Sequence, residues 1–293
     1  MDITRLKQNI RGFSLDDGPR GSQGYNRVLL QVFGYTGHGK SAFINSCLYA
    51  LDKGREFTEE ADVKQTLGGN TMVRNAYKLT DNITIVDNRG FCVMSDFEKC
   101  EVIAQLGNFI PIGKKVEWKN HFREMMEEVQ ESEMDPQYTD FIVPIFVYSV
   151  KHHMPKQEMP EVKRFMEHCT EMTGVSPIVV LTFKTYRNYD EVQNQFRQMG
   201  AEMVMVIENY TKENHKETVG RTTDILMVID RALSNVKFRM ELPRDPKRER
   251  LERKKFLINY IHMESSKHLK EREEETYKSE KEEKARESSC SLL

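Results

Sequence analysis

The chain has 293 residues, of which 38% are hydrophobic, which suits one domain of at least about 200 residues with an appendage. Its 44 basic and 46 acidic residues give a net charge of -2, which argues against a nucleic-acid partner. No apolar run of about 18 residues is present, and the first residues lack the apolar core of a secretion signal, so we expect a cytosolic protein. The five cysteines show neither a C-x-x-C pair nor alternation with histidine, so we expect reduced thiols and no structural metal.

The pattern of apolar residues divides the chain into three parts. Residues 1–26 are polar and contain a turn-rich stretch, which predicts a flexible leader. From 27 to 240, short apolar runs typical of strands alternate with segments of helical spacing. The expected strands are 27–33, 83–86, 141–150, 177–183 and 203–207. Such alternation predicts an α/β fold with a mainly parallel, three-layer sheet, followed by a charged tail over 241–293.

The run from Gly34 to Ser41 reads Gly-Tyr-Thr-Gly-His-Gly-Lys-Ser and matches the phosphate-binding pattern G-x-x-x-x-G-K-[ST]. Its glycines let successive backbone N–H groups point inward, toward the phosphates of a nucleotide. The run follows an expected buried strand, 27–33, and precedes apolar residues at helical spacing over 41–51. This order of strand, loop and helix indicates a nucleotide-binding P-loop rather than an ordinary glycine turn.

The pattern assigns roles to individual residues of the loop. Lys40 is expected to reach the β and γ phosphates as a catalytic residue, and Ser41 to be a ligand of Mg²⁺. The residues expected to contact the nucleotide are Gly34, Tyr35, Thr36, Gly37, His38, Gly39, Lys40, Ser41, Ala42, Gly90, Thr182 and Lys184.

Asp87 and Gly90 form a D-x-x-G element at the end of the apolar run 83–86. In P-loop proteins a carboxylate at a strand end holds Mg²⁺, and the glycine amide senses the γ-phosphate. Thr71, in the preceding glycine-containing loop, is expected to close over the γ-phosphate as a metal ligand and catalytic residue, with Thr66 as the alternative. The competing interpretations are an ordinary turn at Asp87 and an ordinary surface loop at Thr71.

These pieces together resemble the interferon-induced protein 44 family of GTPase-like proteins. The resemblance covers roughly residues 25 to 238 and is carried by the run from Val28 to Ser41, the loop threonine followed by Tyr77, the D-x-x-G element, the run 178–182, Glu208-Asn209-Tyr210 and the helix expected over 225–236. It implies a Ras-like G domain, GTP or GDP with Mg²⁺ as ligands, and a role in immune response.

Two departures from a typical GTPase concern the base and the rate. A guanine-reading loop presents [NT]-K-x-D, whereas the chain reads Thr182-Phe183-Lys184-Thr185, and Asp190 lies too far along to replace the missing acid. After Gly90 no glutamine is present to orient water. His38 either orients water or faces solvent, and we favour solvent, while the direction of Arg89 is left open. Slow intrinsic hydrolysis is our hypothesis.

The segment between 108 and 137 contains an apolar stripe at helical spacing, formed by Trp118, Phe122, Met125, Met126 and Val129. Something must cover this face. Packing against the sheet is the favoured interpretation, and a nucleotide-dependent dimer or effector surface is the alternative.

The chain ends Cys290-Ser291-Leu292-Leu293, which matches the C-a-a-X prenylation signal and, with its terminal leucine, favours a geranylgeranyl group on Cys290. The alternative is an unmodified cysteine. Residues 247–255 hold six basic and two acidic side chains that could meet anionic lipid. The rest of the tail is expected to be either a solvated helical stalk or a partly disordered spacer, and its first amphipathic turns either dock on the G domain or pair with another copy.

The leading hypothesis is a nucleotide switch: a slow GTPase tethered by its lipid to the cytoplasmic face of a membrane. Its expected partners are guanine nucleotide, the membrane and a second copy of the chain. The rival hypothesis is a scaffold that binds nucleotide without hydrolysing it. A third, an ATP-using kinase, has no second substrate pocket readable in the sequence.

Overall fold

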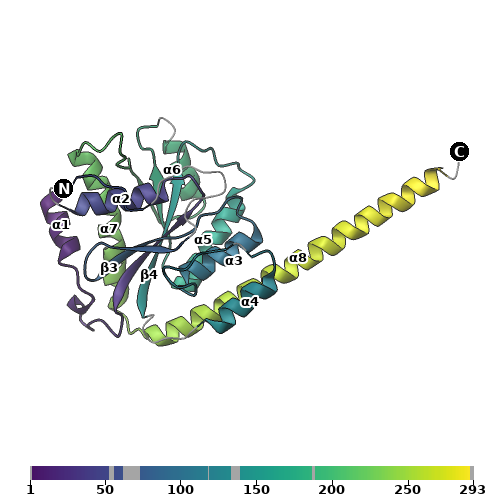
Figure 1. Ribbon diagram of the computed structural model, residues 1–293, viewed down its shortest axis with the longest axis horizontal. Coiled ribbons are helices and arrows are strands. Elements are labelled where there is room, and N and C mark those ends of the chain that lie inside the picture. The colour runs from purple at the N-terminus through teal and green to yellow at the C-terminus, as the bar shows by residue number, and fades with distance from the viewer. Residues whose placement is uncertain are drawn as a thin grey trace.

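The structure is a computed structural model that describes residues 2–52, 56–61, 73–117, 119–132, 139–186 and 189–290. A central sheet lies between two layers of helices, and one long helix extends well beyond the body of the domain (Figure 1). The three-layer α/β fold expected from the sequence is confirmed.

The sheet has six strands in the order β2-β3-β1-β4-β5-β6. Five of the strands are mutually parallel, and β2 at one edge is antiparallel to β3. The bounds are β1 Arg27–Gly34, β2 Asn75–Lys78, β3 Ile83–Asp87, β4 Asp140–Ser149, β5 Ile178–Thr182 and β6 Met203–Val206. The central strands β1 and β4 are buried on both faces, which is why they read as continuous apolar runs. The edge strand β2 is short and polar, and the apolar pattern did not reveal it.

One face of the sheet is covered by α2 (Lys40–Leu51), α7 (Val219–Met240) and α1 (Ile3–Arg11). The prediction of a flexible leader over 1–26 is wrong for α1, which is a helix capped by Asp2 and packed on α7. Leu6 and Ile10 supply its buried face. The prediction failed because apolar side chains one helical turn apart suffice when a neighbouring helix is already in place.

The other face is covered by α3 (Asp96–Leu106), α5 (Met159–Thr173) and α6 (Tyr189–Gln198), and α8 (Pro246–Cys290) packs on α3 and α5. The insertion helix α4 (Phe122–Glu131) packs on α8 and α3 rather than on the sheet. Met125 and Val129, two residues of the predicted stripe, are buried there, whereas Trp118 lies outside the described residues. The favoured interpretation of the stripe is therefore wrong about what covers it: the chain's own C-terminal helix does.

The tail is a helix of 45 residues, α8, whose first turn is capped by the carboxylate of Asp245. Its first half docks on the domain through Leu257, Tyr260 and Ile261, which are buried between α3 and α5. Its second half is charged and projects away from the domain (Figure 1). Of the alternatives, docking and a helical stalk both hold, each for one half of the tail. None of the described helices combines the length and apolarity needed to span a bilayer.

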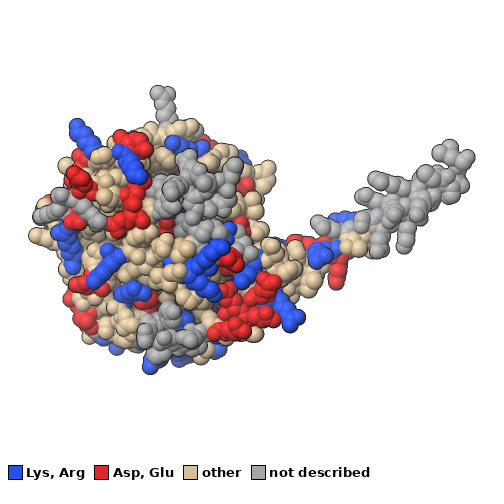
Figure 2. Space-filling view, viewed as in Figure 1, with Lys and Arg blue, Asp and Glu red and all other residues tan. Residues whose placement is uncertain are grey.

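The basic run at the start of α8 contacts the chain itself. Arg250 and Arg253 are buried, and Lys254 donates to the carbonyl groups of Gln130 and Ser132 at the end of α4. Figure 2 shows acidic side chains gathered over α4, beside these turns of α8. Because a lysine at a helix C-terminus also meets the negative end of the helix dipole, this part of the run stabilises the α4–α8 contact. The idea that the whole run meets lipid is wrong for Arg250 and Arg253.

Candidate functional site

The glycine loop leaves β1 at the carboxyl edge of the sheet, under tight steric limits. Gly34 has φ 136°, and a Cβ there would overlap the carbonyl oxygen of Val147 in β4. Gly37 and Gly39 also have positive φ values, 79° and 92°. The Thr36 amide donates to the Phe91 carbonyl at 2.8 Å, which ties the loop to the D-x-x-G segment. The glycines of the pattern are therefore required by backbone conformation and close packing.

The helix α2 begins directly after the loop, with Gly39 at its N-cap and no side chain capping it. The first turn of a helix has backbone N–H groups without intrahelical partners, and the helix dipole places partial positive charge there. The first intrahelical bond runs from the Phe43 amide to the Gly39 carbonyl at 2.9 Å. The amides of residues 40–42 thus form an end suited to an anion.

Lys40 is buried, and its Nζ donates to the carbonyl oxygens of Gly34 at 3.3 Å and Tyr35 at 2.9 Å. Burial lowers the pKa of Lys40 to about 8, against the opposing attraction of Asp87. The ammonium lies so close to Gly90 that a Cβ at that position would overlap Nζ. The Lys40 side chain and the D-x-x-G glycine therefore occupy one compact site, as the sequence predicted.

Ser41 and Asp87 are also brought together. Ser41 Oγ donates to Asp87 Oδ2 at 2.6 Å, and Asp87 is buried at the carboxyl end of β3. A hydroxyl and a carboxylate at this spacing, next to an anion site, are the oxygen ligands that Mg²⁺ takes together with phosphate oxygens and water. Thr71 and Thr66, the predicted metal and γ-phosphate residues of the preceding loop, lie outside the described residues.

His38 is buried, so the favoured prediction that it faces solvent is wrong. Its ring stacks on His152, with centroids 4.4 Å apart, and its Nδ1 accepts a hydrogen bond from the Ser149 amide at 3.2 Å. Burial, assisted by the nearby charges of His152 and Lys40, lowers the pKa of His38 to about 3. The sequence could not reveal this burial because the aromatic neighbours come from β4 and the loop after it. A neutral ring held in this way orients the loop rather than supplying charge.

Thr182 and Lys184, the predicted base-side contacts, have partners within the chain. Thr182 Oγ1 donates to the His38 carbonyl at 3.0 Å, so this hydroxyl braces the glycine loop. Lys184 Nζ forms an ion pair with Asp224 in α7 at 2.5 Å and stays partly exposed. Their contact with a nucleotide stays a prediction.

Arg89, whose direction the sequence left open, points away from the glycine loop. Its Nη1 donates to the Val116 carbonyl at 2.7 Å, and its backbone amide donates to Gln105 at 2.8 Å. Asn88, the residue before it, accepts a hydrogen bond at its Oδ1 from Nε of Arg74, at 2.8 Å. Arg74 is buried and directly precedes β2. These hydrogen bonds anchor the D-x-x-G segment to α3, to the residue before β2 and to the loop before α4.

Sequence reasoning used Glu208 and Asn209, the two residues after Ile207, only as part of the family resemblance and gave them no role in the site. Glu208 Oε2 accepts hydrogen bonds from both the amide and the hydroxyl of Thr185, each at 2.9 Å. Asn209 Nδ2 donates to the Gly39 carbonyl at 3.2 Å. The available signal was the position of this pair at a strand end, because carboxyl ends of parallel strands meet at one edge of the sheet.

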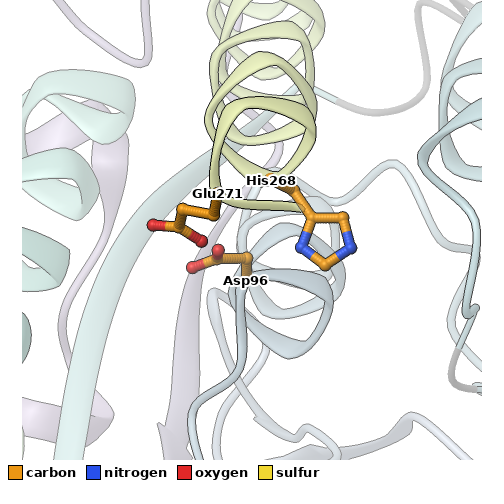
Figure 3. Close-up of side chains that lie close together, drawn as sticks. All are labelled: Asp96, His268 and Glu271. Atoms are coloured by element: carbon orange, nitrogen blue, oxygen red, sulfur yellow. The ribbon is translucent and has the colours of Figure 1, made fainter. Parts of the chain in front are cut away.

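A separate polar cluster joins α3 to α8 (Figure 3). Asp96, His268 and Glu271 bring their possible ligand atoms within 4.8 Å of one another. Lysines already neutralise the acids: Lys99 Nζ lies 2.6 Å from Asp96 Oδ1, and Lys267 Nζ lies 3.5 Å from Asp96 Oδ2 and 4.0 Å from Glu271. We therefore interpret this cluster as an ionic contact that fixes α8 on α3.

The second predicted site is the C-terminal cysteine. The helix α8 ends at Cys290, and residues 291–293 of the C-a-a-X signal lie outside the described residues. From Leu269 to Cys290 a helix rises about 30 Å, so the cysteine is carried far from the docked half of α8.

The strand order, the glycine loop and the D-x-x-G element define a P-loop α/β domain with a Ras-like fold. No protein-family model and no curated protein matches the chain. Among solved structures it is similar to Toc33 from Arabidopsis thaliana in complex with GDP and Mg²⁺, with 14% identity, coverage of 74% of this chain and 87% of that one, and a TM-score of 0.45. It is also similar to Toc33 in complex with Mg²⁺ and GMPPNP, with 12% identity, coverage of 80% and 91%, and a TM-score of 0.43. A probable GTP-binding protein engB matches with 14% identity over 72% of this chain and 100% of that one, at a TM-score of 0.36.

Proposed function

We propose that this chain binds GTP and GDP with Mg²⁺ and acts as a nucleotide switch. One observation carries the proposal: buried Lys40, the Ser41–Asp87 pair and the uncapped start of α2 converge at one edge of the sheet. A cation, two oxygen ligands and a row of backbone donors are the groups that a nucleotide phosphate with its Mg²⁺ requires.

The substitution Lys40→Ala tests this assignment. Removing the ammonium should weaken nucleotide binding at least about 100-fold, because hydrogen bonds to charged groups are the stronger ones and several would be lost. Titration of a fluorescent GDP analogue in the presence of Mg²⁺ measures the affinity. Lys115→Ala, at an exposed lysine paired with Glu117, is the matched control and should bind as the wild type does. Unchanged affinity in Lys40→Ala would reject the site.

We propose that hydrolysis is slow. The D-x-x-G segment offers no glutamine, and Arg89 and His38 make hydrogen bonds within the chain, to Val116 and from Ser149. These same contacts favour the second candidate, a scaffold that binds nucleotide without turnover. Phosphate release under single-turnover conditions separates the two: a slow, Lys40-dependent release supports the GTPase, and the absence of release supports the scaffold.

We further propose that a geranylgeranyl group on Cys290 tethers the domain to the cytoplasmic face of a membrane. The support is the C-a-a-X sequence and the position of Cys290 at the end of a projecting helix. Since one lipid chain anchors only weakly, the anchor should be reversible. Cys290→Ser should move the protein to the soluble fraction, whereas Cys92→Ser, at an exposed cysteine of the domain, should not. Equal membrane fractions in all three forms would reject the anchor.

The resemblance to the interferon-induced protein 44 family is what supports a role in immune response, and induction of the transcript by interferon tests it. We also propose that the chain can form a homodimer, as expected from the sequence. Sedimentation with GDP and with a non-hydrolysable GTP analogue tests whether the chain pairs in either state.

A further inference from the structure

The base-reading loop lacks its acid in sequence, and the structure places one beside it from the loop that follows the next strand, β6. Thr185 stands at the fourth position of Thr182-Phe183-Lys184-Thr185, where a guanine-reading loop carries aspartate. The carboxylate of Glu208 lies directly on Thr185, where its Oε2 accepts from the backbone amide and from Oγ1, both at 2.9 Å. An acidic group is therefore held at the missing position by a residue 23 positions further along the chain.

The backbone around this acid is fixed by the sheet. The strands β5 and β6 are parallel neighbours, so the loops that follow them meet at the same edge. The Ile207 amide donates to Leu181 at 2.8 Å, and the Lys184 amide donates to Ile207 at 3.0 Å. These bonds extend the ladder beyond both strands and hold Glu208 in register with Thr185.

The acid also lies on the same edge as the proposed phosphate site. Asn209, the next residue, donates to the Gly39 carbonyl at the start of α2, at 3.2 Å. Glu208 is half-buried, so its carboxylate is reachable from outside. Its second oxygen, Oε1, makes no hydrogen bond to any residue that the structure describes. One oxygen is thus used for positioning, and the other can accept from a ligand.

We propose that Glu208 replaces the missing aspartate and selects guanine, an inference that rests on the nucleotide binding proposed above. Guanine presents two donors on one edge, N1–H and the N2 amino group, and the two lone pairs of Oε1 can accept from both. Adenine presents an acceptor at N1, which a carboxylate repels. Discrimination by such polar pairing is strong because the wrong base leaves a charged group without a partner.

The substitution Glu208→Gln tests the role with little change of shape. In the variant the amide oxygen keeps the hydrogen bond from the Thr185 amide, and the NH₂ group takes the place of Oε1. A donor then faces the two donors of guanine, which disfavours this base. The NH₂ group fits xanthine, whose position 2 carries a carbonyl. We expect wild-type protein to bind GTP in strong preference to ATP, and Glu208→Gln to lose about 10- to 100-fold in GTP affinity and to gain affinity for xanthosine triphosphate.

Glu202→Gln is the matched control. Glu202 directly precedes the first residue of β6, at the end of the strand away from Glu208, and its Oε1 accepts a hydrogen bond from Ser176 Oγ at 2.8 Å. Its replacement should therefore leave the affinities for GTP, ATP and xanthosine triphosphate unchanged. Thr185→Asp in the Glu208→Gln background should restore GTP preference, since it places a carboxylate at the original position. Competition against a fluorescent GDP analogue gives the three affinities, and thermal unfolding checks each fold.

Three results would overturn the inference: equal affinities of the wild type for GTP and ATP, a Glu208→Gln variant that loses all nucleotides equally with a lowered melting temperature, or no recovery in the double variant. In each of these the wild-type protein still binds nucleotide. Failure of the proposed function looks different, because wild-type protein would then bind no nucleotide at all.

Discussion

Two regions of the molecule were visible as patterns in the sequence: the carboxyl edge of the sheet, and the pair of helices α4 and α8 that pack on each other, called here the α4–α8 unit. Only for the first could the sequence predict which residues come together. The glycine loop is eight consecutive residues whose chemistry depends on their own backbone. The stripe of α4 and the amphipathic turns of α8 lie more than 100 residues apart, and each completes the other. A site is predictable when its parts are local, whereas an apolar face shows only that it needs a partner.

The largest effect is expected at Gly34 of the carboxyl edge. This residue is the first glycine of the phosphate-binding pattern and also packs against β4. Alanine at this position would place Cβ on the Val147 carbonyl and demand φ 136° of a side-chain-bearing residue. Because neither backbone can move without disturbing the β1–β4 ladder, we expect Gly34→Ala to destabilise the fold by about 4 kcal/mol or more. Urea unfolding followed by circular dichroism measures it.

Gly37→Ala is the control for that experiment. Gly37 also has a positive φ, 79°, but a Cβ there would meet no atom within 4 Å. Its cost should be only the conformational strain, about 1 to 2 kcal/mol. Equal losses in the two variants would show that packing against β4 is not what limits Gly34.

The next largest effect concerns the docked half of α8. Leu257 is fully buried, and Leu257→Ala should cost about 3 kcal/mol, since it removes apolar contacts and leaves a cavity. Leu269, further along the same helix, is exposed, and its replacement by alanine should change stability by less than about 0.5 kcal/mol. If both variants unfold at the same urea concentration, α8 does not pack on α3 and α5 in solution.

The same contrast explains which parts of the fold and of the site could be predicted from the sequence. The strands of the sheet were predicted because buried parallel strands read as continuous apolar runs, but β2 was missed because it is polar and lies at an edge. Lys40, Ser41 and Asp87 were brought together as predicted. The environment of His38, the ordered α1 and the acid at Glu208 could not be predicted, because each depends on a residue from another element at a distance in the chain.

Titration separates the two regions, beginning with Glu101 of α3, which lines one cavity together with Glu128 of α4 and Ile261 of α8. Burial, with repulsion from Glu128, raises the pKa of Glu101 to about 8. A folded-state pKa above the unfolded value of about 4.3 means that the folded state holds a proton that the unfolded state has lost. Stability should therefore fall by about 3 kcal/mol as the pH rises from 5.5 to 8. Urea unfolding at four pH values measures this slope, and Glu101→Gln, which is neutral throughout, should remove it. A slope that survives the substitution would assign it to another group.

The smallest expected effect is the pH dependence that His38 gives at the carboxyl edge of the sheet. It has the opposite sign, because stability falls as the pH is lowered. Burial lowers the pKa of His38 to about 3 in the folded state, against about 6.5 in the unfolded state. Below pH 6.5 the unfolded state therefore binds a proton at this residue, whereas the folded state stays neutral. Stability should fall by about 1 to 2 kcal/mol as the pH drops from 6.5 to 5. His38→Gln should flatten this acidic slope and leave the alkaline slope of Glu101 unchanged, whereas Glu101→Gln should do the reverse. Because the Nδ1 of His38 accepts from Ser149, glutamine offers a carbonyl in its place, which keeps the loop supported. If one substitution removed both slopes, the carboxyl edge and the α4–α8 unit would titrate as one network, and the contrast between them would not hold.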